Sequence, residues 1–534
     1  MDPHRPTATH LAVRDGRILA GGDSECARGG GVATVDDTLA DKILLPGFVE
    51  GHSHTMEGSV WEFPYVGYFD RTDPNGVRWP GSKDIDAVVG RLRQAEAQLP
   101  DPEAPLLAWG FDPIYFDNRR LKAADLDRVS TTRPVLVMHA SFHLLNVNSA
   151  ILQRAGIHRD TPVKGVFKGD DGEPTGELME MAAKFIALRA AGRNFYEGLN
   201  SPVALWRFGR SAWRVGITTA ADLYNDLPEA AVEALVVATR AEDFPIRIVS
   251  AFIGGALPPS EGVAKWQQLL VHNHDRLRFG PIKLMTDGSI QGFTARLQWP
   301  GYYNGAPQGL WNLEPQQLFE VLHAFHAAGG QVHIHTNGDE ASHLALEAIA
   351  AALQRTPRFD HRHTLQHCQM APESQFRRMA RLGTCVNLFS NHLYYWGDAH
   401  KALTLGPDRA HRMDAARTAL ACGVPLAIHS DAPVTPLGPL FTAWCAVNRR
   451  TARGEQLGDY ECISVDDALR AITLGAAYTL KLDHEVGSLE VGKRADVAIL
   501  EEDPLAVAPD TLKDVPVWGT MLGGRLMAQS DGQG

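Results

Sequence analysis

Two histidines separated by one residue, His52 and His54, close the segment Leu-Pro-Gly-Phe-Val-Glu-Gly-His-Ser-His. Alternate residues of a β-strand point to the same side, so on a strand these two imidazoles aim at one point. Imidazole nitrogens are common ligands of Zn²⁺ and related ions. A pair by itself is more often two hydrogen-bonded histidines beside a turn, so the metal hypothesis needs further ligands elsewhere in the chain.

Further candidate ligands stand in or just after four later apolar segments. These segments read PIKLMTDGS, HIHTNGD, TLQHCQM and AIHSDAPV, and they contain Lys283, His335, His367 and Asp431. Each residue alone has an ordinary explanation, such as a hydrogen-bonded core histidine, a paired lysine or a turn-forming aspartate. Reactive residues of a parallel barrel lie at the C-terminal ends of its strands. The joint placement of the six residues therefore predicts a metal site.

The elements that must position these residues alternate between strand and helix patterns. Helical periodicity lies between many of the strand segments, for example over 229–241 and 315–328. The pattern predicts a (β/α)8 barrel of the TIM type. The alternative is an open doubly wound sheet, which usually carries a glycine-rich loop after its first strand, where this chain has the two histidines. The eight expected strand segments are 43–54, 216–223, 244–253, 277–287, 331–336, 363–368, 383–390 and 424–431.

The sequence predicts that the chain is divided into three structural parts. Short alternating segments around Asp15-Gly16 and over 495–500 and 515–521 predict a small composite β-sandwich built from residues 1–46 and 486–534. Residues 47–485 form the barrel. The long interval after the first strand has its own strand and helix signals, so we expect an inserted α/β subdomain over 60–210 that covers the barrel mouth.

Composition limits the classes of function. The chain has 534 residues, 44% hydrophobic and 21% charged, with a formal net charge of −12. This charge disfavours binding to nucleic acid or to an anionic membrane surface. Six cysteines without a C-x-x-C pair, no apolar run of about 18 residues and no signal-peptide pattern favour a cytoplasmic protein. We expect a small-molecule substrate, no nucleic-acid or membrane partner, and a homodimer as the candidate assembly.

The chain resembles the amidohydrolase superfamily, and within it the YtcJ-like metal-dependent hydrolases, a group that includes N-substituted formamide deformylase. The matching motifs run in order along nearly the whole chain: GRILAGG, ILLPGFVEGHSH, WGFD, RPVLVMHASFHLLNVNSAIL, GEPTGELME, GITTAAD, IKLMTDGSI, HIHTNGDEA, HTLQHCQM, HSDAPVTPLGPL and GSLEVGKRADVAILEEDP. The resemblance implies a barrel with a composite β-sandwich and an insertion after the first strand, which agrees with the periodicity.

The resemblance also implies the ligand set. It assigns the metal to His52, His54, Lys283, His335, His367 and Asp431. It further implies that a carboxylated Lys283 bridges two metals. An ammonium has no lone pair, whereas a neutral amine reacts with CO2 to give an anionic carbamate with two oxygens. The alternative is an unmodified lysine beside a single metal. We thus expect one or two divalent ions per subunit, with Zn as the expected metal.

Three residues depart from the pattern of the wider group. His333 makes a second His-x-His with His335, His429 stands where a small residue is commoner, and Asn337 precedes Gly-Asp in place of an apolar or small residue. His335 is favoured over His333 as the ligand because His-x-x-Gly-Asp is the family pattern. His333 could donate a hydrogen bond to the ligand shell or replace a ligand. We expect all three departures to bear mainly on the substrate.

The expected reaction is hydrolysis of a C–N bond in an amide, an N-acyl or N-formyl amine, or a cyclic amide. A metal-activated hydroxide would attack the carbonyl. Asp431 is the expected general base, which takes the proton and passes it to the leaving amine. His143, in the segment HASFH, is the candidate donor to the oxyanion, with a structural hydrogen bond inside the insertion as its alternative.

Aromatic loops after the first and seventh strands predict a substrate with an apolar or aromatic part. Packing between the insertion and the barrel explains the same aromatic residues equally well. A decarboxylase or isomerase on the same scaffold and a non-catalytic binding protein are the alternative functions, and the filled ligand positions argue against the second. The expected substrate-binding residues are Trp61, Tyr65, His333, Asn337, His392, Tyr395 and His429.

Overall fold

The computed structural model describes residues 7–25, 34–196, 198–199 and 201–528. Cys26 and the glycines at 29–31 lie outside the described residues. The chain divides into two compact units, which we describe separately. The barrel unit contains Met1–His54, Gly209–Ala432 and Leu437–Gly534, and the inserted unit contains Thr55–Phe208 and Pro433–Pro436. In the described part of the chain, no helix has the length and apolarity needed to cross a bilayer.

The barrel unit contains an eight-stranded parallel sheet, counted over the described residues. Each predicted strand segment has a counterpart in this sheet, and the TIM-type barrel is confirmed. The strands, in the order of the sheet, are β4 (Phe48–Ser53), β12 (Ile217–Asn225), β13 (Arg247–Ile253), β14 (Leu277–Met285), β15 (Gln331–Thr336), β16 (Thr364–His367), β17 (Cys385–Leu388) and β18 (Leu426–Ile428).

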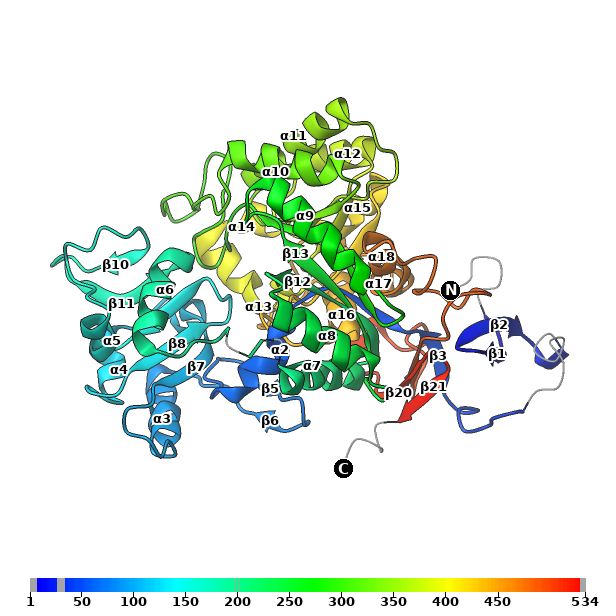
Figure 1. Ribbon diagram of the computed structural model, residues 1–534, viewed down its shortest axis with the longest axis horizontal. Coiled ribbons are helices and arrows are strands. Elements are labelled where there is room, and N and C mark those ends of the chain that lie inside the picture. The colour runs from blue at the N-terminus through cyan, green and yellow to red at the C-terminus, as the bar shows by residue number, and fades with distance from the viewer. Residues whose placement is uncertain (1–6, 26–33, 197, 200, 529–534) are drawn as a thin grey trace. The chain divides into compact units, whose positions relative to one another are not determined.

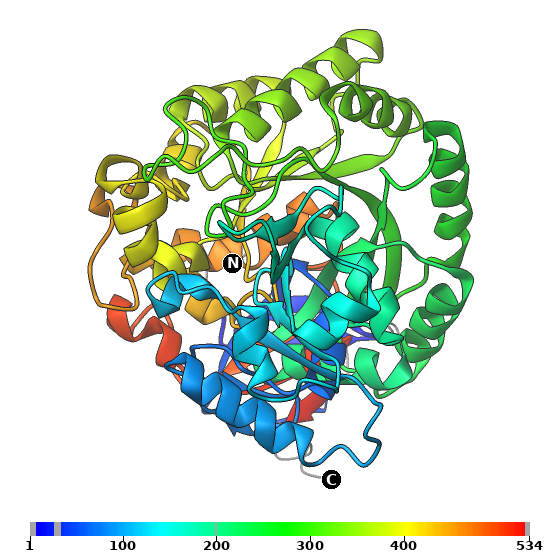
Figure 2. The ribbon, with the colours of Figure 1, turned by 90° about the vertical axis from the view of Figure 1, so that its left-hand side faces the viewer.

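Helices follow most of these strands and lie around the outside of the sheet, where Figure 2 shows them in green to yellow. Helix α11 illustrates why they form: its sequence is rich in alanine, leucine and glutamate, and its first turn holds Asp339 and Glu340, which favour a helix N-terminus. Figure 1 shows α10, α11 and α12 as neighbours. The main helices of this unit are α8 (Glu229–Arg240), α9 (Pro259–Leu269), α10 (Pro315–Ala327), α11 (Asp339–Arg355), α12 (Glu373–Leu382), α13 (Asn391–Ala399), α15 (Ala416–Ala421), α16 (Pro439–Asn448), α17 (Val465–Ala471) and α18 (Leu474–Thr479).

The first predicted strand, 43–54, is two strands rather than one. β3 (Ile43–Pro46) pairs with β19 (Val497–Leu500) of the terminal sheet, and β4 joins the barrel. The break is at Gly47, where an added Cβ would meet the side chain of Thr218 at 2.1 Å. Only a residue without a side chain lets the chain pass here from one sheet to the other.

Contacts just beyond the strand ends join the first and the eighth strand. The backbone N–H of Asp431 donates to the carbonyl oxygen of His52 at 3.1 Å, and that of His54 donates to Ala432 at 2.8 Å. The register across the sheet places Met285 beside His335, and His335 beside Gln366. The C-terminal ends of strands that are distant in sequence thus meet at one rim.

The two termini build one antiparallel sheet in the barrel unit. Its order is β21 (Arg525–Ala528), β20 (Val517–Leu522), β19 and β3. A hairpin of β1 (His10–Arg14) and β2 (Arg17–Gly22) joins it through a backbone hydrogen bond of 2.9 Å from Ile18 to Lys493. A buried ion pair of 2.6 Å between Arg247 Nε and Asp496 Oδ2 connects this sheet with β13 of the barrel.

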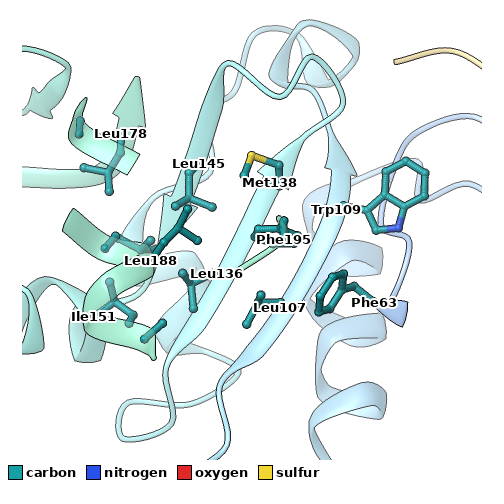
Figure 3. Close-up of a cluster of buried hydrophobic side chains, with 14 of the residues drawn as sticks. Phe63, Leu107, Trp109, Leu136, Met138, Leu145, Ile151, Leu178, Leu188 and Phe195 are labelled. Atoms are coloured by element: carbon teal, nitrogen blue, oxygen red, sulfur yellow. The ribbon is translucent and has the colours of Figure 1, made fainter. Parts of the chain in front are cut away.

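The inserted unit is an α/β unit with a five-stranded mixed sheet, counted over its described residues. Apolar side chains alternate between the two faces of the sheet. On one face Leu107 and Trp109 pack in the cluster that Figure 3 shows, which includes residues of α6. On the other face Leu106 and Ala108 pack with residues of α3. The sheet order is β10 (Val166–Lys168), β11 (Pro174–Met179), β9 (Leu144–Val147), β8 (Val135–His139) and β7 (Leu106–Phe111), and the helices are α3 (Ile85–Glu96), α4 (Ala123–Asp127), α5 (Ser149–Arg154) and α6 (Glu180–Ala191).

Candidate metal centre

The six predicted ligands come from five strands of the barrel or from the residues that directly follow them. His52 lies in β4 and His54 follows it, Lys283 lies in β14, and His335 lies in β15. His367 ends β16, and Asp431 follows β18. All of them except His54 are buried. This arrangement agrees with the rule that strand ends position the reactive residues of a barrel.

The carboxylate of Asp431 brings the first pair of histidines together. Its Oδ1 lies 3.2 Å from His52 Nε2 and 3.1 Å from His54 Nε2. Lys283 Nζ lies 3.3 Å from the same nitrogen of His52. Two potential ligands from two other strands, Asp431 and Lys283, thus lie beside one ring nitrogen of His52.

Two overlapping groups of side chains have the spacing needed to hold a metal ion. One consists of His52, His54 and Asp431, and the other of His52, His367 and His429. Within each group the potential ligand atoms all lie within 4.8 Å of one another. The two groups share His52, so they belong to one centre.

Burial keeps three histidines of this centre, His52, His367 and His429, neutral. Burial, and then the nearby Lys283, lower the pKa of His52 well below its usual value. Burial is also the main reason why the pKa of His367 is strongly lowered and that of His429 falls to about 3. A neutral imidazole retains a lone pair, which a cation needs and a protonated ring lacks.

The charged groups of the centre respond to the same surroundings in different ways. Burial alone would raise the pKa of Asp431, but the hydrogen bond with His54 and nearby positive charge bring it to about 2. Asp431 is therefore a carboxylate at neutral pH. Burial lowers the pKa of Lys283 to about 7, which makes a neutral amine accessible at that position.

Two residues of the centre have strained backbone conformations. His367 has a φ of 69° and Asp431 a φ of 54°, both in the left-handed region. Such conformations cost roughly 1–3 kcal/mol each in non-glycine residues and gather at functional sites. His367 ends β16 and Asp431 comes three residues after β18, and the turns at these positions redirect the two side chains.

A glutamine that the sequence analysis did not single out orients His52. The side-chain Oε1 of Gln366 lies 2.8 Å from His52 Nδ1, and its Nε2 lies 2.7 Å from His333 Nδ1. An amide oxygen only accepts, so His52 donates from Nδ1 and keeps the lone pair of Nε2 for a ligand role. His333 accepts a hydrogen bond from the amide nitrogen of Gln366. This bond fixes the orientation of the glutamine side chain that contacts His52.

Glu50 is a second residue that the sequence analysis missed. It is buried and accepts hydrogen bonds from the backbone N–H of Ser430 at 3.1 Å and from the Ser430 hydroxyl at 2.9 Å. Burial raises the pKa of Glu50 to about 8, against the effect of these hydrogen bonds. Because Ser430 precedes Asp431, Glu50 positions the turn that carries the carboxylate.

His335 lies beside the two groups without belonging to either. Its ring centroid is 4.4 Å from that of His367, while its Nε2 lies 3.2 Å from the carbonyl oxygen of Gly288. The side chain of Asn337 donates to the same carbonyl at 2.8 Å. Asp287 accepts from the backbone N–H of Asn337, so this loop holds the end of β15 in place.

His392 and Tyr395 come from α13, which follows the seventh strand of the barrel. His392 is buried, its ring centroid lies 6.5 Å from that of His367, and its Nδ1 lies 3.5 Å from Asp414 Oδ1. Tyr395 is half-buried and packs against Phe441 at 5.9 Å between ring centroids. A substrate contact of either residue stays a prediction.

The remaining predicted residues belong to the inserted unit and are described within it. Tyr65 is buried in its core and its hydroxyl donates to Phe69, while Trp61 donates to Glu57 at 3.1 Å. His143 Nδ1 lies 3.0 Å from Glu180 Oε1. The contact of His143 is of the kind given as its alternative, a structural hydrogen bond inside the insertion, and the substrate and catalytic roles of all three residues stay predictions.

A divalent cation fits the side chains present. The centre offers neutral imidazole nitrogens and one carboxylate, which are ligands for Zn²⁺ and related ions. Nδ1 of His367 and both ring nitrogens of His429 are buried and have no hydrogen-bond partner among the described residues. Burying an unpaired polar group is costly, and ligation removes that cost.

The sequence contained some signals for the missed residues. Glu50 is two residues before His52, so strand alternation alone suggested that it could share a side with the ligands. Gln366 precedes His367 inside the segment HTLQHCQM, where nothing in the sequence marked it as a partner of His52. Its role depends on the rotation of a side chain that the order of residues does not determine.

Comparisons with known proteins agree with this architecture. A sequence model described as "Amidohydrolase family" matches residues 35–528. YtcJ of Bacillus subtilis (strain 168) is 28% identical over 532 residues, which cover 96% of this chain and 95% of that protein. N-substituted formamide deformylase of Arthrobacter pascens is 26% identical over 548 residues, with coverages of 100% and 97%. The crystal structure of an uncharacterized metal-dependent hydrolase from Pyrococcus horikoshii OT3 has a TM-score of 0.70, 22% identity, and coverages of 93% and 94%.

Proposed function

The chain belongs to the amidohydrolase family, and on that premise we propose that it is a metal-dependent hydrolase of a small molecule. The bond cleaved is a C–N bond other than a peptide bond, in an amide, an N-acyl or N-formyl amine, or a cyclic amide. A relative of nearly equal length is named for the deformylation of N-substituted formamides, which supports this bond type. The observation that carries the proposal is Asp431 Oδ1 within 3.2 Å of both His52 and His54.

The proposed ligands are those listed above: His52, His54, Lys283, His335, His367 and Asp431. Because most of them are nitrogen donors with one carboxylate, Zn²⁺ is the proposed ion. When bound, such an ion lowers the pKa of a water molecule and polarises a carbonyl oxygen. The centre has donors for one or two ions.

Asp431 is the proposed general base. It is ionised at neutral pH, and an ionised carboxylate only accepts, so it can take the proton of the attacking water. The same carboxyl group would then return this proton to the nitrogen of the leaving amine. Glu50 and the left-handed turn at Asp431 hold the carboxylate in place during both transfers.

Lys283 is proposed to carry a carbamate formed with CO2. Its Nζ lies 3.3 Å from His52 Nε2, and it forms no ion pair with a carboxylate within 4.0 Å among the described residues. An ammonium has no lone pair for a metal ion, whereas a carbamate would offer two oxygens to the centre. Carboxylation thus explains a lysine among metal ligands.

Substrate recognition is proposed for residues of both units. His392 and Tyr395 on α13 supply a polar and an aromatic group, and Asn337 supplies an amide beside His335. His143, held by Glu180, is the proposed donor to the oxyanion. Trp61, Tyr65 and His333 complete the set of expected substrate contacts.

The test is a substrate screen combined with elemental analysis. Purified protein is assayed against N-formyl amines, N-acyl amines, carbamates and hydantoin-like rings, with released amine and acid as the readout. We expect about one to two equivalents of a divalent metal and loss of turnover after chelation, with recovery on adding Zn²⁺. Full activity of metal-free protein would overturn the mechanism. Release of CO2 or an isomer in place of amine plus acid would favour the decarboxylase or isomerase instead.

Location and assembly are part of the same proposal. We place the protein in the cytoplasm, which the free thiols of Cys368, Cys385 and Cys445 support. A homodimer is the proposed assembly. Cell fractionation and analytical ultracentrifugation test these two statements, and a protein found only outside the cytoplasm, or a monomer at all concentrations, would contradict them.

A further inference from the structure

We infer that His429, which no pattern of the family assigns as a ligand, is a direct ligand of the metal centre. The side chain is fully buried, and both ring nitrogens lack a hydrogen-bond partner among the described residues. Buried polar groups of proteins are nearly always paired. A ring with two unpaired nitrogens beside a cluster of ligands therefore indicates a partner that is not a protein side chain.

Neighbouring rings determine how His429 can act. The ring stacks on His52 with 4.5 Å between centroids and 23° between planes, and on Phe389 with 5.0 Å and 21°. His367 stands edge-on to it at 5.0 Å. Because aromatic rings cover both faces of His429, only the edge that carries the nitrogens can interact with a polar group. Ligation would engage one nitrogen and place the proton on the other.

The spacing of ligand atoms supports the same conclusion. Potential ligand atoms of His52, His367 and His429 all lie within 4.8 Å of one another. The second nitrogen of His52 is already engaged with Gln366 at 2.8 Å, so only Nε2 is available to an ion. One nitrogen lone pair binds one ion. The ion on His52 is thus the one shared by the group of His367 and His429 and the group of His54 and Asp431.

Ligation by His429 also affects which metal ion the centre prefers. His429 adds a nitrogen donor to a centre in which oxygen donors are few. Nitrogen-rich sites favour Zn²⁺, Co²⁺, Ni²⁺ or Cu²⁺ over Mg²⁺ and Ca²⁺, which prefer oxygen ligands. The centre of this chain is therefore expected to discriminate more strongly against Mg²⁺ than a centre with a small residue at position 429.

This inference rests on the proposed metal centre, and the experiment separates the two. Metal-free full-length protein is titrated with Co²⁺, read by its visible absorption bands, and its Zn²⁺ affinity is measured by competition with a chelator. The test variant is His429→Phe, which retains the ring between His52 and Phe389 but removes both nitrogens. The matched control is His392→Phe, another buried histidine that belongs to neither group.

We expect His429→Phe to bind Zn²⁺ at least about 10-fold more weakly, because even partners outside the ligand shell contribute about 10- to 100-fold. Its Co²⁺ bands should change in position and intensity, while His392→Phe stays within about twofold of the parent protein. Equal affinity and an unchanged spectrum of a folded His429→Phe protein would overturn the inference and leave the proposed function intact. A parent protein that binds neither ion would overturn the metal centre itself.

A second variant tests ligation by the appearance of a new absorption band, and not by a loss of metal affinity. In His429→Cys, a thiolate that ligates Co²⁺ adds a ligand-to-metal charge-transfer band in the near ultraviolet, which the parent protein lacks. Absence of this band in a folded, Co²⁺-binding His429→Cys protein would place position 429 outside the ligand shell. If His429→Phe does not fold, as judged by circular dichroism, this variant decides the question.

Discussion

The side-chain oxygen of Gln366 lies 2.8 Å from Nδ1 of His52 and so determines which nitrogen of that histidine faces the metal centre. His333 supports the glutamine from its other end. Metal-binding histidines generally need such a partner on the second nitrogen, because it fixes the tautomer and the orientation of the ring. Gln366 thus acts as this partner for His52.

Replacement of this glutamine should weaken metal binding. Gln366→Met retains volume but removes both hydrogen bonds, so we expect Zn²⁺ affinity to fall about 10- to 100-fold. Chelator competition on folded protein measures the change. Gln375→Met is the control, because Gln375 is also buried but donates to Asp339 on another element. Equal affinities of the two variants would show that Gln366 does not position His52.

Loss of the carboxylate should stop turnover with little effect on the fold. Asp431→Asn retains the shape of the side chain but cannot take up a proton as a base. We expect kcat on an active N-acyl or N-formyl amine to fall by at least about 100-fold, in line with the usual contribution of a general base. Most of the metal and the melting temperature should be retained. Undiminished turnover of this variant would remove Asp431 from its proposed role.

The carbamate can be tested by chemical rescue. Lys283→Ala removes the amine and leaves space beside His52. We expect lower metal content and loss of activity, both restored in part by formate, acetate or propionate, whose carboxylates replace the carbamate oxygens. Metal content measured with and without the acid is the readout besides activity. Full metal content of Lys283→Ala without any acid would show that position 283 is not a ligand.

Stability should fall below neutral pH because of histidines at the other end of the barrel. His363 is buried, accepts from the backbone N–H of Val332 and lies 2.8 Å from His326 Nδ1. Burial lowers the pKa of His363 well below 6.5. The unfolded chain therefore takes up a proton below about pH 6.5 that the folded chain does not, and each such proton lowers the free energy of unfolding by about 1.4 kcal/mol per pH unit.

Urea unfolding of metal-free protein between pH 5 and 8 measures this slope. His363→Gln can retain one donor and one acceptor but does not titrate, so its slope below pH 6.5 should be smaller by up to about one proton. His272→Gln is the control, because His272 is exposed. Identical slopes for the parent protein and His363→Gln would mean that His363 is protonated in the folded chain.

Much of the fold could be predicted from local patterns of apolar and polar residues in the sequence. Each of the eight strand segments was visible as a short apolar run between helical patterns, because a parallel strand buried on both faces has few polar residues. Position along those strands was enough to bring together His52, His367 and Asp431. The break of the first strand at Gly47 was not visible, because it results from Thr218, which is 171 residues away in the sequence.

The sequence by itself determined which residues could ligate a metal and at which rim of the sheet they lie, because strand order and alternation specify both. Only the tertiary structure decided how the side chains are used. It placed His429 against His52 and Phe389 with unpaired nitrogens, and it turned Gln366 toward His52. Ring rotation and hydrogen-bond partners depend on atoms contributed by distant segments, and these meet only when the barrel closes.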